Sequence, residues 1–366
     1  FSIGPARTSG TGVFEDVYEV LPGHYLICAP DHCRQDCYWK LESHPHEDSY
    51  EKTIETTAFL VEDSIRRQMV SDVPVCTFLS GGVDSSLVSS ICAQELKKQN
   101  KRLTTFSFDF VGNKENFKAN SFQPSQDRPY VEQMVSYLNS DHHFLECSTR
   151  AQAELLKDSV LAHDLPAMAD VDSSMLYFCE QVSKTNQVAL TGECADEIFG
   201  GYPWFHDENL WSKHTFPWSW DMDARKALLD DDFASSLHME DYSQRAYMDT
   251  IESTPHLSDD TPQEARRREI AWLNIRWFMM TLLNRMDRAS MYSGLEARVP
   301  FADHRILDYV YSIPWHMKCY NGQTKSLLVE AGKPFLPDSV LYRKKSPYPK
   351  TYDPAYEQLL ADRLLE

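Results

Sequence analysis

The segment Ser80–Ser86, with the sequence Ser-Gly-Gly-Val-Asp-Ser-Ser, has the residue types and spacing needed to hold a phosphate. It follows the apolar run Val73–Leu79 and opens a run, Ser85–Leu96, that can be a helix. Glycines between a strand and a helix N-terminus let backbone N–H groups close around an anion, and the helix dipole favours negative charge there. Asp84 is an acceptor beside such a site, which makes chemical sense if a divalent metal ion lies between it and the phosphate. Hydroxyl donors come from Ser80, Ser85 and Ser86.

The chain contains neither the G-x-x-x-x-G-K-[ST] nor the G-x-G-x-x-G pattern. Its Ser-Gly-Gly-x-Asp-Ser segment instead resembles the pyrophosphate loop of the N-type ATP pyrophosphatases. That resemblance implies cleavage of ATP between the α and β phosphates and transfer of AMP to a carboxylate or carbonyl oxygen. The alternative is an ordinary serine–glycine turn, which six matched positions between a strand and a helix disfavour.

A second candidate segment, Leu190–Tyr202, is acidic and glycine-rich and follows a short apolar run. Its carboxylates at 193, 196 and 197 repel one another unless a metal ion or a substrate cation neutralises them. We therefore predict that Asp84 and Asp196 hold one Mg²⁺ ion, and that Thr191 and Gly192 bring backbone close to a nucleotide. The alternative is an acidic helix N-terminus, which the helix dipole favours.

The elements that must position these segments alternate along the chain. Apolar runs predict strands over about 73–79, 103–110, 142–147 and 187–191; helical patterns predict helices over 85–99, 127–139, 150–163 and 172–186. This alternation predicts an α/β fold with a doubly wound, mostly parallel sheet. Both candidate segments then lie at carboxyl ends of strands, where ligands bind. After about residue 200 we expect helices only, including a long one over Glu264–Arg285, which gives a helical C-terminal part.

Residues 1–45 are predicted to be strands and turns, with two short β runs around Pro22-Gly23. The polar stretch Ser43–Asp48 is typical of a linker, and a helix is predicted over Tyr50–Val70. We therefore divide the chain into a β segment, 1–45, and a domain spanning 46–366. The four tryptophans at 204, 211, 218 and 220 could form a substrate lid or a packing surface. The polar insertion 112–129 could be a surface loop or a lid.

The composition of the chain argues against some classes of binding partner. The 366 residues carry a net charge of −19, which disfavours nucleic acids and anionic membranes as partners. No apolar run is long enough to span a membrane, and no signal peptide is evident. The short basic cluster Arg266–Arg268 is predicted to be a solvated helix face.

Cysteine usage predicts a reducing compartment, most simply the cytoplasm. Cys76, Cys92, Cys147 and Cys179 lie in apolar patterns and are predicted to be buried thiols. A zinc site from Cys28, Cys33, Cys37 and His32 is conceivable but disfavoured, because the spacing lacks a paired C-x-x-C.

Two further pairs of blocks make the resemblance more specific: Asp287–Met291 with Glu296–Asp303, and Gly322–Leu328 with Arg343–Pro347. Together with the first two segments, they resemble the synthetase domain of glutamine-hydrolysing asparagine synthetases. The resemblance extends from about residue 50 to the C-terminus, and residues 1–45 resemble the last strands of that family's glutaminase domain. The rest of that domain, including its N-terminal cysteine nucleophile, is missing from this chain. Four positions depart from the family pattern: Thr191 for a usual serine, Cys194 for a usual glycine, Val329 for an arginine and Ala302 for a leucine.

The resemblance implies three reactants, which are ATP with Mg²⁺, L-aspartate, and ammonia released from glutamine. The aspartate side chain would form β-aspartyl-AMP with release of pyrophosphate, and ammonia would then displace AMP. Lys325 matches the lysine that stabilises charge at the reacting phosphate, and Glu193 would orient the amino acid or the ammonia. Nucleotide contacts would come from Phe78, Ser80, Gly81, Gly82, Asp84, Ser85, Ser86, Phe108, Thr191 and Gly192.

Several residues keep two interpretations. Phe78 and Phe108 could contact adenine or simply belong to the core. Glu296 and Arg298 could support the aspartate site. The cluster Arg343–Lys345 could close over the phosphates or be a solvated turn.

Other functions remain open at this point. β-Lactam-forming synthetases and lasso-peptide cyclases resemble the same domain and use an internal amine as acceptor. A non-catalytic module that only binds nucleotide is a second alternative, although it would not need Asp84, Asp196 and Lys325 together. The sequence is also compatible with a homodimer.

Overall fold

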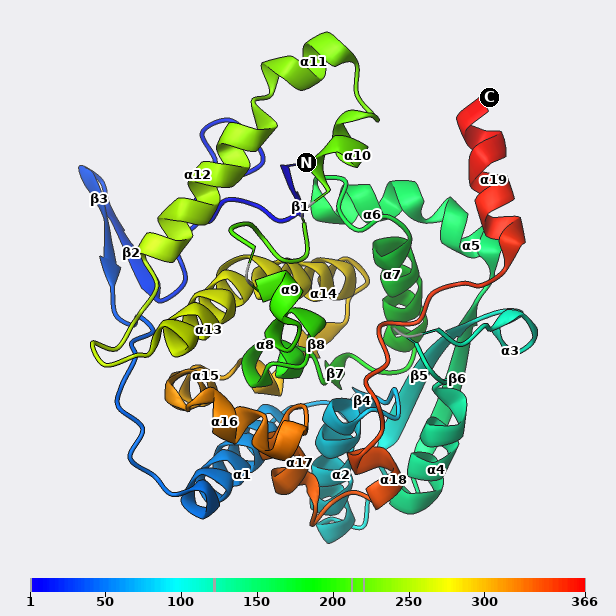
Figure 1. The fold of residues 1–366 in the computed structure, drawn as a ribbon. Helices are drawn as coiled ribbons and strands as arrows, with labels where there is room; N and C mark the ends of the chain where they lie inside the picture. The colour runs from blue at the N-terminus through cyan, green and yellow to red at the C-terminus, as the bar shows by residue number, and fades with distance from the viewer. Residues whose placement is uncertain (1, 121–122, 212, 220, 366) are drawn as a thin grey trace. The chain divides into compact units, whose positions relative to one another are not determined.

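A five-stranded parallel sheet forms the centre of the fold in the computed structural model, which describes residues 2–120, 123–211, 213–219 and 221–365. The strands are β4 (Val75–Phe78), β5 (Thr104–Phe110), β6 (Asp141–Cys147), β7 (Val188–Leu190) and β8 (Glu296–Arg298), in the spatial order β6-β5-β4-β7-β8 (Figure 1). The predicted α/β class is confirmed. The expectation that strands end near residue 200 is wrong, because β8 pairs in parallel with β7. Three residues, Glu-Ala-Arg, carry too little apolar pattern to predict a strand.

Helices cover both faces of this sheet, as the doubly wound prediction requires. On one face, Thr77 of β4 bonds Ser89 of α2 (Val83–Lys98) at 2.7 Å. On the other face, Cys76 and Phe78 pack with residues of α7 (Asp170–Ser183) and α14 (Met280–Tyr292). Successive residues of β4 therefore point to opposite helical layers, as strand geometry dictates.

The predicted helices α1 (Tyr50–Gln68) and α4 (Arg128–Leu138) are present with shifted ends, whereas the helix expected over 150–163 is divided into α5 (Thr149–Glu154) and α6 (Leu156–His163). Other helices of the sheet-bearing unit are α8 (Ala195–Phe199), α15 (His304–Ser312), α17 (Ser326–Gly332), α18 (Asp338–Leu341) and α19 (Pro354–Leu365). The long helix expected over 264–285 is instead α13 (Pro262–Leu273), a π-helical stretch η2 (Asn274–Met279) and α14. Helix α1 begins where the hydroxyl of Ser49 accepts from the N–H of Lys52.

The chain divides into two compact units. The first comprises residues 1–46, 202–281 and 311–314; the second, which holds the sheet, comprises 47–201, 282–310 and 315–366. The first unit contains β1 (Ser2–Pro5), the antiparallel hairpin of β2 (His24–Ala29) and β3 (His32–Cys37), and the helix α12 (Met239–Glu252). Of the two β runs predicted around Pro22-Gly23, the second lies in β2, but the first is not a strand, since within it only Tyr18 forms an isolated bridge, to Thr11. Strands β2 and β3 are joined at Pro30-Asp31.

Aromatic rings of the first unit pack on one another rather than standing alone. Trp204 stacks on Tyr202 with ring centroids 4.4 Å apart and lies 5.5 Å from Trp218. These contacts fit the packing interpretation of the tryptophan-rich segment. Trp220 lies outside the described residues, and so do residues 121–122 of the predicted insertion.

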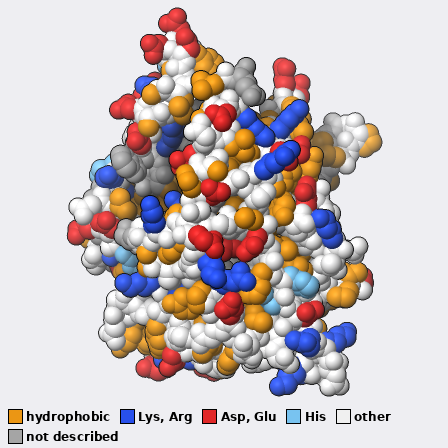
Figure 2. Space-filling view, turned by 90° about the vertical axis from the view of Figure 1, so that its right-hand side faces the viewer, with side chains coloured by type: hydrophobic (Ala, Val, Ile, Leu, Met, Phe, Trp, Pro, Cys, Tyr) orange, Lys and Arg blue, Asp and Glu red, His pale blue; other side chains and the backbone are white. Residues whose placement is uncertain are grey.

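The described helices include none that is both long and apolar enough to cross a bilayer. Cys76, Cys92, Cys147 and Cys179 are buried, as predicted. Acidic and basic side chains are interspersed on the face that Figure 2 shows.

Candidate active site

The loop that follows β4 is closed by its own hydroxyl groups. The Ser80 and Ser85 hydroxyls are 2.9 Å apart, and the N–H of Ser80 donates to Ser85 Oγ at 3.1 Å. Gly82 is the N-cap of α2, so the first N–H groups of that helix face the loop. Ser86 Oγ is buried and, within the described part of the chain, has no hydrogen-bond partner. The loop therefore has the strand–turn–helix geometry predicted for an anion site.

Two glycines permit close approaches at this loop. Gly81 has φ +72°, and a Cβ placed on it would lie 2.7 Å from Tyr130 Cβ of α4. A Cβ on Gly192 would lie 2.7 Å from the backbone N of Ser85. The backbone after β7 thus touches the N-terminal turn of α2. In chain order the sheet runs 3-2-1-4-5, so β4 and β7 flank the point where strand order reverses, and this is where α/β sheets bind ligands.

Lys325 joins the two predicted metal ligands. Its Nζ lies 2.7 Å from both carboxylate oxygens of Asp84 and 2.9 Å from Oδ1 of Asp196. The lysine side chain is 7% exposed, so Lys325 is not a solvent-exposed helix residue. Lys325 is the N-cap of α17 with φ 52°, a left-handed conformation that non-glycine residues adopt at a cost.

Electrostatics separates the two carboxylates. Burial raises the pKa of Asp84, and burial together with the charge of Asp196 outweighs the lowering by Lys325. Burial also opposes ionisation of Asp196, but Lys325 and Lys345 outweigh it and hold the pKa of Asp196 well below its usual range. The pKa of Lys325 is raised above its usual value, because the two aspartates outweigh its burial. The cluster therefore keeps its lysine charged and Asp196 ionised at neutral pH.

The cluster 343–345 also reaches this site. Lys345 Nζ forms an ion pair with Asp196 Oδ2. Arg343 donates to the carbonyl of Ser80 at 3.1 Å, forms an ion pair with Asp127 and lies over the ring of Tyr130. The side chain of Arg343 is 3% exposed, whereas Lys344 is exposed. Arg343 and Lys345 thus belong to the site, and Lys344 is on the surface.

Sequence comparison agrees with this geometry. The asparagine synthase family model matches residues 57–366. This chain belongs to the asparagine synthase family. Over 365 residues it is 45% identical to asparagine synthetase [glutamine-hydrolyzing] 3 of Bacillus subtilis. The matched region covers 100% of this chain and 59% of that protein.

More distant relatives include a protein named as an amidase. Amidase chry2 of Gibberella zeae is 24% identical over 93% of this chain and 60% of its own length, and asparagine synthetase [glutamine-hydrolyzing] 1 of Bacillus subtilis is 25% identical over 91% and 55%. The chain spans about six-tenths of the length of these three relatives.

A second buried ion pair of the asparagine synthase domain involves Glu193. Arg285 of α14 donates to Glu193 Oε1 at 2.7 Å, and the two side chains are 8% and 17% exposed. Among the atoms described, Glu193 Oε2 and Arg285 Nε have no hydrogen-bond partner. The backbone N–H of Glu193 donates to Thr191 Oγ1. Glu193 is thus fixed, with one carboxylate oxygen unused, in the segment after β7 that touches the first turn of α2.

The two phenylalanines lie in the core of the domain. The rings of Phe78 and Phe108 are 4.8 Å apart, and Phe108 stacks on Phe178 at 4.4 Å. Phe78 is 8% exposed. Their contact with adenine stays a prediction, since their ring faces are largely used by the core.

Three residues of the site were given no role by the sequence. Asp127, the N-cap of α4, forms an ion pair with Arg343, and Arg285 donates to Glu193. Gly201 makes room for Asp196, because a Cβ there would lie 1.9 Å from Asp196 Oδ1. Only Gly201 had a detectable signal, as part of the acidic segment; Asp127 and Arg285 come from unrelated parts of the chain.

The blocks around β8 contribute less than predicted. Arg298 pairs with Glu296 at 2.7 Å and donates to the carbonyls of Gln68 and Val70. Arg298 therefore holds the end of α1, and these bonds do not reach the loop Ser80–Ser86. His142 of β6 bonds Thr105 and Ser107 of the neighbouring strand β5.

The donor set fits part of a magnesium site. Mg²⁺ in nucleotide sites is bound by one or two carboxylates, with water and phosphate oxygens completing the octahedron. Asp84 and Asp196 both reach one ammonium group, so a single cation can serve both carboxylates. The described residues contain no group of three or more His, Cys, Asp or Glu side chains able to hold a metal by themselves. The protein alone therefore supplies only part of a coordination sphere, as expected where phosphate supplies the rest.

Proposed function

We propose that this chain catalyses ATP-dependent amidation of L-aspartate to L-asparagine, with β-aspartyl-AMP as intermediate and with AMP and pyrophosphate as products. The observation that supports it most is the convergence of Lys325, Asp84 and Asp196 on the N-terminal turn of α2. A site for an anion needs donors, and a site for phosphoryl cleavage also needs a buried, permanently charged cation. The raised pKa of Lys325 keeps its ammonium group protonated, so Lys325 supplies that charge.

The chain's residues divide the work of the first step. The N–H groups of Gly81, Gly82 and the first turn of α2, with the hydroxyl of Ser86, would bind the β and γ phosphates. Lys325 would move from the aspartates to the oxygen that bridges the α and β phosphates and stabilise its growing charge. When bound, Mg²⁺ would be held by Asp84 and Asp196 and would neutralise phosphate charge there. Arg343 and Lys345, which belong to the C-terminal segment, would limit the access of water to the phosphates.

Glu193 would serve the amino-acid substrate or the ammonia. Its unused Oε2 can accept a hydrogen bond from an ammonium group, while Arg285 keeps the other oxygen fixed. We further propose that glutamine hydrolysis supplies the ammonia in a glutaminase domain, of which residues 1–45 are the final part.

Pyrophosphate release tests this proposal directly. With ATP, Mg²⁺, L-aspartate and ammonium, we expect aspartate-dependent pyrophosphate and AMP, and asparagine in equal amount. Lys345→Ala should lower kcat/KM by about 10- to 100-fold because Asp196 loses one of its two cations. Lys344→Ala is the matched control and should match the parent. ADP formation, or turnover independent of aspartate, would contradict the proposal.

A related amide-forming synthetase is the second candidate. It is favoured by the likeness to a protein named as an amidase, which covers 93% of this chain. Such an enzyme would adenylate another carboxylate and use an amine other than ammonia. Pyrophosphate exchange into ATP with a panel of carboxylates separates the two, since only the true acceptor would support exchange. Nucleotide binding without exchange for any carboxylate would instead favour a non-catalytic module.

A further inference from the structure

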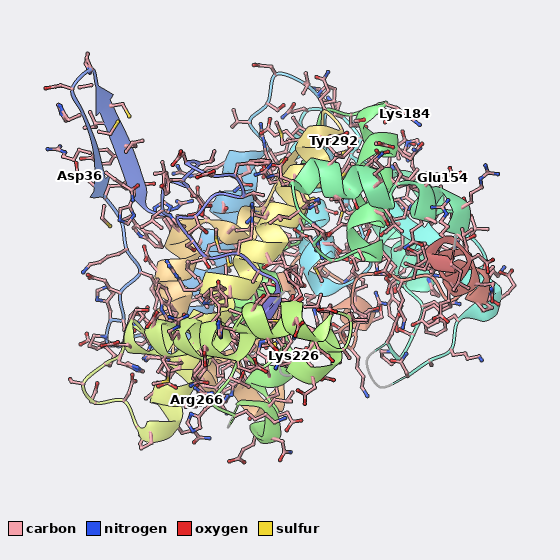
Figure 3. The ribbon with its side chains drawn as sticks, turned by 90° about the horizontal axis from the view of Figure 1, so that it is seen from above. Asp36, Glu154, Lys184, Lys226, Arg266 and Tyr292 are labelled. Carbon is pink, nitrogen blue, oxygen red and sulfur yellow. The ribbon has the colours of Figure 1, made fainter. Side chains whose placement is uncertain are left out.

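The β2–β3 hairpin carries a facing pair of cysteines that the proposed function does not use. Cys28 on β2 lies directly opposite Cys33 on β3 in the antiparallel register. Their Sγ atoms are 2.8 Å apart, with the Cys33 thiol donating to Cys28. Both residues are exposed. Figure 3 shows this hairpin, with Asp36 of β3 labelled.

The position of the pair in the hairpin suits a covalent bond. Ala29 and His32 close a loop of two residues, and a turn of this kind is closed by a hydrogen-bonded pair. Pairs alternate along antiparallel strands, so Cys28 and Cys33 form a non-hydrogen-bonded pair, with Cα atoms about 4.5 Å apart. Disulfides span Cα distances of roughly 4.4–6.8 Å. A bond between these sulfurs therefore needs side-chain rotation and no backbone movement.

Other fates for these thiols are less well supported. Cys37 lies opposite His24, and its thiol donates to the carbonyl of Trp39 at 3.2 Å. His32 is engaged with Asp31, and the described chain brings together no set of three metal-ligating side chains. The structure therefore gives Cys33 one cysteine partner, Cys28, rather than a zinc site.

We propose that Cys28 and Cys33 are a thiol–disulfide modification site, oxidised by a low-molecular-weight disulfide and reversed by thiols. With glutathione disulfide as oxidant, one cysteine thiolate attacks a sulfur of the oxidant and releases one glutathione thiolate. The second cysteine then attacks the protein sulfur of this mixed disulfide and releases the second glutathione. The protein loses two electrons and two protons, and one glutathione disulfide becomes two glutathiones.

Peptide mapping of the native protein can test this cleanly. Cleavage after Arg7, Arg34 and Lys40 gives peptide 8–34, which contains both Cys28 and Cys33, and peptide 35–40, which contains Cys37 alone. After treatment with glutathione disulfide and alkylation under denaturing conditions, we expect peptide 8–34 to lose two hydrogens and to carry no alkyl group. Dithiothreitol should restore two alkylation sites. Peptides 8–34 and 35–40 joined by a disulfide would overturn the assignment.

Single variants distinguish the pair from ordinary reactive thiols. In Cys28→Ser, Cys33 has no resolving partner, so a stable glutathione adduct should remain on peptide 8–34. In Cys37→Ser, the matched control, the intrapeptide disulfide should form as in the parent. Equal glutathione adducts on peptide 8–34 in the parent and in Cys28→Ser would refute the proposal, as would two free thiols in the parent when Cys37 is already glutathionylated.

Discussion

Arg268 and Lys325 are both buried cations, but their surroundings differ. Arg268 Nε donates to both oxygens of Asp260, at 2.8 and 3.1 Å, and its Nη1 donates to the carbonyl of Tyr311. Both side chains of this pair are 7% exposed. Asp260 also accepts from the N–H of Leu257. One cation here faces one carboxylate, and the Nη1 donor of Arg268 has its own acceptor, the carbonyl of Tyr311.

The Lys325 cluster has the opposite character. Two carboxylates share the Lys325 ammonium, and one of them, Asp196, also pairs with Lys345. The backbone of Lys325 is left-handed, and the buried hydroxyl of Ser86 nearby has no partner in the described structure. Buried charges of like sign and unmet hydrogen bonds cost stability unless something else satisfies them. The Arg268 pair is therefore built for stability, and the Lys325 cluster for a ligand that brings its own charges. The solvated helix face predicted for Arg266–Arg268 is thus wrong. Asp260 and Tyr311 enclose Arg268, and the Arg266 side chain, which is 11% exposed, bonds Tyr247 and Glu269.

The variant Lys325→Ala is the strongest test of the difference between the Lys325 cluster and the Arg268 pair. We expect turnover to fall by about 10³-fold, because a charge-stabilising donor is lost at the reacting phosphate. Nucleotide affinity, measured by calorimetry, should change far less. Turnover within a few-fold of the parent would remove Lys325 from the chemistry and place its cluster in the same class as the Arg268 pair.

Arg268→Ala tests the other half of the contrast. Removing one partner of a buried pair leaves Asp260 uncompensated, so the free energy of unfolding should drop by about 3–5 kcal/mol. Turnover per folded molecule should stay unchanged at a temperature where the variant is folded. Denaturant unfolding and active-site titration measure the two effects separately. A large loss of turnover without a loss of stability would contradict the assignment.

The variant Gly192→Ala tests whether the close backbone packing beside the Lys325 cluster is needed. The added Cβ would lie 2.7 Å from the N of Ser85, so the loop after β7 or the start of α2 must shift. We expect a cost of about 1–3 kcal/mol in stability and weaker nucleotide binding. Gly82→Ala is the matched control for crowding: it has negative φ, and its Cβ would meet only Ser80 Oγ, at 3.5 Å. Similar stability losses in both variants would show that crowding at position 192 is not the cause.

The smallest effect comes from His142, which belongs to neither ion cluster. Burial lowers the pKa of His142 to about 4, below an ordinary value of 6.5. Between pH 4 and pH 6.5, His142 is therefore protonated in the unfolded chain but neutral in the folded chain. The stability of the folded chain that is present above pH 6.5 is lost as the pH falls toward 4. After allowance for partial exposure, we expect a loss of about 1–2 kcal/mol. Urea unfolding across this range should show a flatter profile for His142→Gln; an identical profile would exclude His142 as the cause.

The fold was predictable where one local pattern defines each element. The strands at 75–78, 104–110 and 141–147 and the helices between them lie within a few residues of the prediction, because apolar runs and helical periods are local properties. Strand β8 was missed, since its pairing with β7 depends on a neighbour more than 100 residues away in sequence. The first of the two β runs predicted around Pro22-Gly23 is not a strand, and the chain instead reverses between strands at Pro30-Asp31, for a related reason: turn residues mark where a chain can reverse, and strand pairing selects where it does.

For the site, the sequence by itself determined the chemical groups: the glycine loop at 80–82, the carboxylates of Asp84 and Asp196, and Lys325. Tertiary structure alone decided that Lys325 bridges both aspartates and that Phe78 and Phe108 are packed in the core. It also decided that Arg343 reaches the carbonyl of Ser80 and that Lys345 reaches Asp196, while Lys344 stays exposed. The reason is physical. A short motif fixes backbone conformation and functional groups locally, whereas the distance between charges far apart in sequence, and the pKa shifts that follow from it, depend on how the whole chain packs.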